Sequence, residues 1–119
     1  MSDATATVSE LRQAVSSFVD ERDWRQFHTP KNLAMSLAIE AAELMEHFQW
    51  LDVDESITRG RDPLRRGEIA DEIADVGCYL LSLANALDID LSEAVLAKLI
   101  KNACKYPAEE VRGRSERKK

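Results

Sequence analysis

The amino-acid sequence predicts an all-α protein, and three observations lead to that prediction. Apolar side chains recur with helical spacing through most of the chain, and no segment alternates polar and apolar residues as a half-buried strand does. Thr29-Pro30 and Asp62-Pro63 combine a helix cap with proline at the first helical position. A chain of 119 residues has room for one domain. We therefore expect a four-helix bundle of antiparallel hairpins.

The first half of the chain is expected to hold two helices. The first spans Val8–Glu21, with Thr7 or Ser9 as its cap. A connector follows over 23–28, where two aromatic rings and a histidine interrupt the helical pattern. The second helix begins at Thr29-Pro30 and is expected to reach about Leu51.

The second half is expected to hold a loop and two further helices. The polar segment 52–61, which carries Gly60, is interpreted as a loop. The third helix runs from Pro63 to about Leu87 and is apolar over more than half of its circumference. A turn over 88–90 leads into the fourth helix, which ends by Lys105, before Tyr106-Pro107.

Charge and hydropathy exclude several classes of partner. The formal net charge is −6, and the last eight residues carry five basic groups against one acidic group. That segment contributes +4, so the rest of the chain carries −10, which argues against a nucleic-acid-binding body. No apolar run is long enough to span a membrane, and residues 1–7 lack the apolar core of a signal peptide.

Domain limits and cysteine usage complete this picture. We expect a single domain over residues 1–111 and a disordered basic tail over 112–119. Cys78 and Cys104 fall in helical patterns and form no paired motif, so both are expected to be buried, reduced thiols. Reduced thiols are typical of a cytoplasmic protein.

Two pairs of acidic residues lie inside apolar helical segments, Glu40 with Glu43 and Glu72 with Asp75. The i, i+3 spacing points both carboxylates of a pair the same way. About 12 Å of helix separates Glu43 from the turn and about 13 Å separates the turn from Glu72, so an antiparallel hairpin brings the pairs level. Carboxylates this close repel by roughly 3 kcal/mol per pair at an effective dielectric of 20. An all-oxygen cluster therefore predicts a hard divalent cation, Mg²⁺ first and Mn²⁺ second.

Alternatives to this interpretation stay open. The same spacing occurs at Glu68 and Asp71, and the hairpin levelling favours Glu72 and Asp75 only weakly. His47 follows Glu43 by one turn, but the Glu-x-x-His motif of di-iron bundles is missing. The acids are also compatible with a non-enzymatic helical interaction module whose cluster is solvated.

A basic face is expected on the fourth helix, where Lys98, Asn102 and Lys105 recur at i, i+4 and i+7. Beside a metal, such groups would cover the phosphate oxygens that the ion leaves free. A solvated face paired with nearby acids explains the same pattern equally well. For Trp24, Trp50 and His28, packing or local hydrogen bonding is the commoner role.

The acidic pairs and their neighbours resemble the MazG-like nucleotide pyrophosphohydrolases, and the dCTP pyrophosphatase branch most closely. The signature of that family is Glu-x-x-Glu, a spacer and Glu-x-x-Asp. The matching stretches cover most of the chain and are 21–28, 30–33, 48–50, 71–76 and 98–107.

The resemblance implies Mg²⁺-dependent cleavage of a (deoxy)nucleoside triphosphate between the α and β phosphates. A pyrimidine deoxynucleotide such as dCTP is the expected substrate, in nucleotide-pool housekeeping. The implied roles are metal binding by Glu40, Glu43, Glu72 and Asp75, water activation by Glu43, triphosphate contacts by Lys98, Asn102 and Tyr106, and a base and sugar pocket formed by Trp24, His28, Trp50 and Tyr79. The apolar girth of the third helix and the resemblance both imply a homo-oligomer, a tetramer built as a dimer of dimers.

Overall fold

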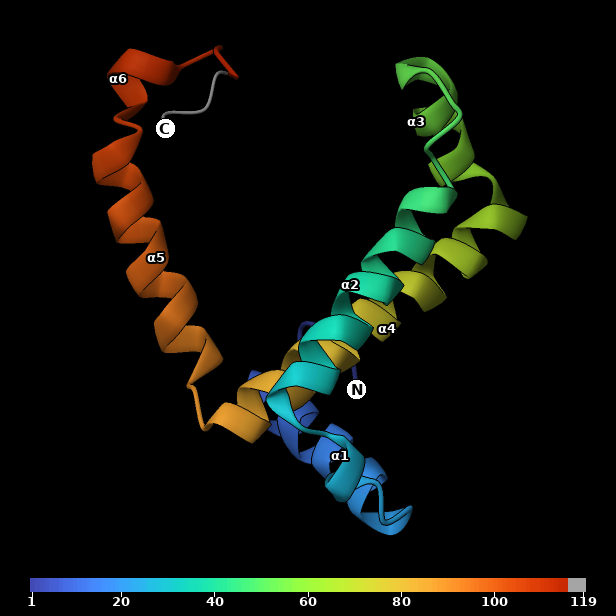
Figure 1. The fold of residues 1–119 in the computed structure, drawn as a ribbon. Helices are drawn as coiled ribbons and strands as arrows, with labels where there is room; N and C mark the ends of the chain where they lie inside the picture. Colours follow the sequence, from blue (N-terminus) through green and yellow to red (C-terminus); the bar gives the residue numbers. More distant parts are fainter. Residues whose placement is uncertain (116–119) are drawn as a thin grey trace. The chain divides into compact units, whose positions relative to one another are not determined.

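The computed structural model describes residues 1–115, and every regular element among them is helical. The elements are α1 (Val8–Glu21), the 3-10 helix η1 (Arg25–Phe27), α2 (Pro30–Glu46), α3 (Val53–Arg61), α4 (Pro63–Leu87), α5 (Leu91–Lys105) and α6 (Ala108–Val111) (Figure 1). The all-α prediction is confirmed for this part of the chain. The last four residues of the expected basic tail, 116–119, lie outside it.

The chain divides into two compact units, residues 1–88 and 89–119. The first unit contains α1 to α4, and the second contains α5 and α6. A four-helix bundle and a single domain over 1–111 both stay predictions. None of the described helices combines the length and the apolar character that a membrane span requires.

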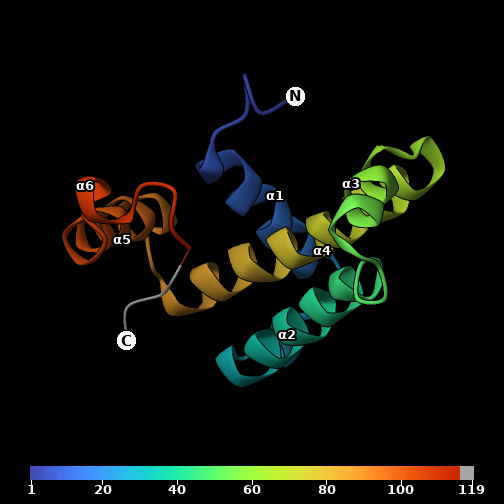
Figure 2. The same cartoon turned by 90° about the horizontal axis from the view of Figure 1, so that it is seen from above.

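The first unit is built around α4, which contacts α1, α2 and α3. Helices α2 and α4 lie side by side and run in opposite directions (Figures 1 and 2). The buried apolar side chains come from three of these helices: Val19 of α1, Leu33 of α2, and Ile69 and Ala84 of α4. This hairpin of α2 and α4 positions the acidic residues.

Capping residues explain where several helices begin. Thr7 caps α1 through its hydroxyl oxygen, which accepts from the Glu10 amide at 3.1 Å, while Glu10 Oε1 accepts from the Thr7 amide at 3.1 Å. Thr29 and Asp62 cap α2 and α4, and proline follows each of them. In the second unit, the Asp90 carboxylate accepts from the Glu93 amide at 2.9 Å and starts α5. The predicted starts of these four helices are confirmed, with Thr7 as the cap of α1.

Two predictions about the middle of the chain were wrong. The segment 52–61 is not a loop, because Asp52 and Glu55 form a capping box and Arg59 and Arg61 stand at the negative end of α3. Helix α2 ends at Glu46 and does not reach Leu51. After Glu46 the chain continues in turns, in which the Phe48 amide donates to the Met45 carbonyl at 2.9 Å, an i to i+3 bond that is tighter than that of an α-helix.

Within residues 1–115, few large side chains are buried. The α2 and α4 hairpin leaves several large apolar residues more than two-fifths exposed: Met35, Ile39, Met45, Ile73 and Leu80. An apolar surface of this extent is typical of a face that another molecule covers. The predicted oligomer is consistent with this exposure.

Candidate active site

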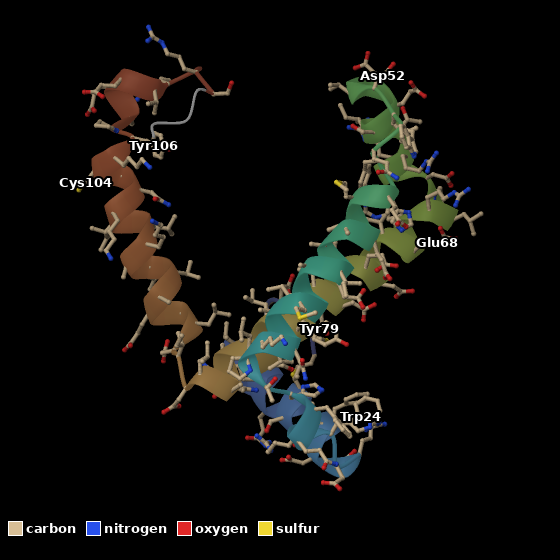
Figure 3. All side chains as sticks on the ribbon, in the orientation of Figure 1. Trp24, Asp52, Glu68, Tyr79, Cys104 and Tyr106 are labelled. Carbon is tan, nitrogen blue, oxygen red and sulfur yellow. The ribbon has the colours of Figure 1, made fainter. Side chains whose placement is uncertain are left out.

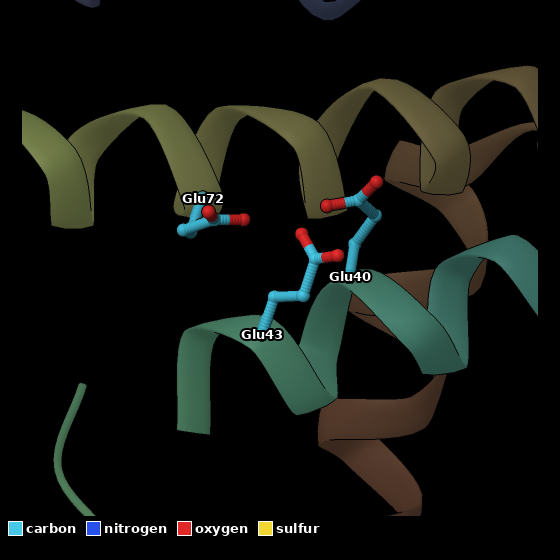
Figure 4. A group of neighbouring side chains, drawn as sticks. All are labelled: Glu40, Glu43 and Glu72. Carbon is cyan, nitrogen blue, oxygen red and sulfur yellow. The ribbon is translucent and has the colours of Figure 1, made fainter. Parts of the chain in front are cut away.

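Three glutamates from α2 and α4 face one another across the hairpin (Figure 4). Glu40 and Glu43 stand one turn apart on α2, and Glu72 comes from α4. Each can offer one carboxylate oxygen so that the three atoms lie within 4.8 Å of one another. The antiparallel hairpin therefore brings the acids level, as their spacing predicts, although the connection between them is a helix.

Asp75 stands one turn beyond Glu72 on α4 and is not a member of this three-glutamate group. It is nevertheless close enough to act electrostatically on two of its members. Partial burial is the largest cause that raises the pKa of Glu72, and the charges of Glu43 and Asp75 add to it. The fourth predicted ligand thus lies at the edge of the cluster.

The cluster carries more negative charge than its surroundings stabilise. Partial burial, the neighbouring Glu43 and then the charges of Asp75 and Glu72 raise the pKa of Glu40 to about 7. Two buried oxygens, Glu40 Oε2 and Glu72 Oε2, have no hydrogen-bond partner in the described part of the chain. Since buried carboxylate oxygens need a donor or a cation, the three glutamates fit a divalent metal ion with oxygen ligands.

The alternative frame on α4 has a different environment. Glu68 is paired with Arg65, whose Nη1 lies 3.2 Å from Glu68 Oε2, and both side chains are about half exposed. Asp71 is exposed. Of the two frames, the one that contains Glu72 faces α2. His47 does not belong to the group of possible ligands.

A pocket of about 420 Å³ lies between α1, the connector and α4. Three residues predicted to surround a nucleoside line it, namely Trp24, His28 and Tyr79, of which Trp24 and Tyr79 are labelled in Figure 3. Asp75 lines the same pocket, so the pocket adjoins the acidic cluster. Residues that are distant in sequence are therefore brought to one cavity.

The aromatic wall of this pocket includes Phe18, which the sequence did not single out as a site residue. The Phe18 and Trp24 rings meet edge to face, with centroids 5.9 Å apart. The Arg22 guanidinium lies 3.7 Å from the Phe18 centroid, and its Nη1 donates to the Phe18 carbonyl at 3.0 Å. The i, i+4 spacing of Phe18 and Arg22 predicts their mutual contact but does not place Phe18 at the pocket.

The four remaining predicted site residues come from the turn after α2 and from the second unit. Trp50 stands on the turn after α2, is 85% exposed and does not line the pocket. Lys98 and Asn102 belong to α5, and Tyr106, which is labelled in Figure 3, follows that helix; all three are in the second unit. The Lys105 ammonium lies 5.5 Å from the centroid of the Tyr106 ring. The predicted place of these residues opposite the acids stays a prediction.

Fold and site together define an all-α protein with a metal-fitting carboxylate cluster beside an aromatic pocket. The MazG-like family matches residues 35–119, and this chain belongs to that family. It is 40% identical over 111 residues to human dCTP pyrophosphatase 1 and 38% identical over 107 residues to dCTP pyrophosphatase 1 of Bos taurus. These alignments cover 93% and 90% of this chain but 65% and 63% of the relatives, so the chain spans less than two thirds of their length.

A solved structure has the same fold. The crystal structure of a pyrophosphatase from Archaeoglobus fulgidus superposes with a TM-score of 0.80 at 44% sequence identity. The match covers 90% of this chain and 98% of that one.

Proposed function

We propose that this chain hydrolyses (deoxy)nucleoside triphosphates to the monophosphate and pyrophosphate. The observation that carries the proposal is the position of Asp75, which lines the aromatic pocket and acts electrostatically on the glutamate cluster. A nucleoside in the pocket would place its phosphates toward the acids. The names of the relatives, dCTP pyrophosphatase 1, support dCTP or another pyrimidine deoxynucleotide as the substrate.

Glu40, Glu43 and Glu72, with Asp75, would hold Mg²⁺, and Mn²⁺ could replace it. The support for this is the all-oxygen donor set and the two unpartnered buried oxygens. When bound, the ion supplies positive charge that offsets the negative charge of the phosphates during hydrolysis.

Glu43 is the proposed general base. It is the exposed member of the group, while Glu40 and Glu72 are half-buried, so a water molecule has access to its carboxylate. Glu43 would accept a proton from that water as the water oxygen attacks the α-phosphorus. The bond from the α-phosphorus to the bridging oxygen breaks, and pyrophosphate leaves with the electron pair.

Trp24, His28 and Tyr79 would surround the base and sugar, as their place around one pocket supports. Lys98, Asn102 and Tyr106 would contact the triphosphate, since ammonium, amide and hydroxyl groups donate to phosphate oxygens. We assign Trp50 to a pocket completed by a neighbouring subunit, because it is too exposed to serve its own chain's pocket.

The proposed assembly is a homotetramer, a dimer of dimers, in the cytoplasm. Its support is the exposed apolar surface of α2 and α4, which includes Met35, Ile39 and Ile73. Cys78 and Cys104 are exposed, so the expectation that they are buried was wrong, but both are free thiols, which fits a reducing compartment.

The test is pyrophosphate release from a panel of the four common deoxynucleoside triphosphates, with Mg²⁺ and with a chelator. We expect turnover only with metal, and fastest with a pyrimidine nucleotide. An absence of turnover on every nucleotide would leave a non-enzymatic helical interaction module as the better interpretation.

A further inference from the structure

His28 lies between two cavities of different size. It lines the pocket of about 420 Å³ and also a second cavity of about 30 Å³ between α1, η1 and α4. Its Nδ1 atom is buried and has no hydrogen-bond partner among the described residues. Ser82, the buried polar residue of α4 at 7% exposure, lines both cavities as well.

The small cavity has both polar and apolar side chains in its lining and is large enough for one water molecule. Besides His28 and Ser82, the polar side chains of Ser16, Arg25 and Asn85 line it. A cavity needs roughly 10–15 Å³ of this volume, and two or more polar partners, to hold a water molecule. Both conditions are met here.

Two of the acceptors around this cavity already have donors. Arg25 Nη2 donates to Ser16 Oγ at 3.1 Å, and Arg12 Nε donates to Asn85 Oδ1 at 2.8 Å. Asn85 Nδ2 in turn donates to the Arg12 carbonyl at 3.2 Å. Because a guanidinium can only donate, the Asn85 amide must present its oxygen to Arg12. The polar groups that are still available to a molecule in the cavity are mainly donors: the second amide hydrogen of Asn85 and the hydroxyls of Ser16 and Ser82.

We propose that one water molecule in this cavity accepts from the Ser16 and Ser82 hydroxyls and donates to His28 Nδ1, which holds the neutral imidazole with its proton on Nε2. A donor-rich surrounding leaves the water's own hydrogens for the acceptor that lacks a partner, and His28 Nδ1 is that acceptor. Ser16 and Ser82 are thus positioning residues, since they act through His28. The consequence for binding rests on the proposed function. His28 would donate its Nε2–H to an acceptor of the nucleotide, such as a base carbonyl oxygen, and would not act as a base.

The experiment is nitrogen NMR of the imidazoles in the full-length chain without nucleotide, above the titration range of histidine. The chain has two histidines, so a His47→Gln variant assigns the His28 signals. We expect Nδ1 of His28 to give an unprotonated-nitrogen signal and Nε2 a protonated one. Ser82→Ala should mix the two tautomers, and Ser82→Thr, which retains the hydroxyl, should restore the original pattern.

Neighbouring serines of α1 supply the matched control. Ser16 lines the small cavity, whereas Ser17 accepts from Gln13 Nε2 at 3.3 Å and lines neither cavity. Ser16→Ala should therefore shift the tautomer balance of His28 as Ser82→Ala does, and it serves where Ser82→Ala fails to fold. Ser17→Ala should leave the signals unchanged.

Two results would overturn the proposal. One is a proton on Nδ1 in the unaltered chain, and the other is a set of His28 signals that neither Ser82→Ala nor Ser16→Ala changes. In kinetic assays, Ser82→Ala should raise KM roughly fivefold with kcat nearly unchanged, as the weakening of one neutral hydrogen bond predicts. The NMR result needs no turnover, so a chain that holds the predicted tautomer without hydrolysing any nucleotide would refute only the proposed function.

Discussion

Single residues of the acidic cluster make the metal-free fold depend on pH. The pKa of Glu40 is about 7 in the folded chain against an ordinary value of 4.5, because of partial burial and the neighbouring carboxylates. Between these values the folded state binds more protons than the unfolded state, so stability is lost as pH rises from about 4.5 to about 7. Glu72 contributes in the same direction.

We therefore expect the melting temperature of the chelator-treated protein to fall as pH rises across this window. Glu43→Gln removes a charge that helps to raise the pKa of both Glu40 and Glu72, so its melting temperature should fall less. Glu46→Gln, a change at an exposed site on the same helix, is the control and should follow the unaltered chain. Equal pH slopes for Glu43→Gln and the unaltered chain would contradict the account.

Cys78 provides a reporter of the pocket. Burial, and then the charge of Asp75, raise the pKa of its thiol, and the side chain lines the pocket. In a Cys104→Ser background, alkylation of Cys78 should be slower than that of a free thiol, and a bound nucleotide should slow it further by roughly threefold or more. Mass spectrometry measures both rates. If a bound nucleotide leaves the alkylation rate of Cys78 unchanged, the pocket is not part of the nucleotide site.

At the scale of elements, the N-cap residues explain which helix starts could be predicted from the sequence. Helices α1, α4 and α5 begin at residues whose side chains accept from the first-turn amides, and those residues are readable in the sequence. Helix α3 carries the same signal at Asp52 and Glu55, but its polar composition and Gly60 were interpreted as a loop. The early end of α2 had no such marker, because it depends on how the chain turns toward Asp52.

The capping box of α3 leads to a stability prediction. Asp52→Ala removes the carboxylate that accepts from the Glu55 amide at 2.8 Å, and should lower the free energy of unfolding by about 1 kcal/mol. Asp54→Ala changes another acid of the same first turn without removing the cap, so it should cost less. Chemical denaturation measures both. A larger loss for Asp54→Ala would contradict the assignment of Asp52 as the cap.

At the scale of the whole molecule, the sequence predicted that three of the four acids lie together, and it predicted less of their surroundings. The i, i+3 pairs were sufficient to bring Glu40, Glu43 and Glu72 together, because helix geometry fixes their direction and the hairpin fixes their level. Ser82 and Phe18 could not be found in this way. Their contribution depends on where α1 crosses α4, which no local spacing specifies.

Assembly is the prediction that belongs to this scale. Met35 of α2 is 54% exposed in one chain, and it would be covered in the proposed tetramer. Met35→Asp should therefore shift the mass measured by light scattering toward smaller species, because burying an unpaired carboxylate is costly. Gln13→Asp adds the same charge at an exposed position of α1 and should leave the mass unchanged. A monomer in the unaltered protein at micromolar concentration would contradict the tetramer.

The central claim is that the glutamate cluster is a metal-dependent catalytic centre. The most direct test is pyrophosphate release from dCTP by the unaltered chain, Glu43→Gln and Glu46→Gln, each at saturating Mg²⁺, with a thermal melt of each protein with and without the metal. We predict that Glu43→Gln folds with an equal or higher melting temperature without metal, gains less stability from Mg²⁺ and loses nearly all hydrolysis, while Glu46→Gln behaves like the unaltered chain. A folded Glu43→Gln protein that releases pyrophosphate at the normal rate would show that the cluster is not the active site.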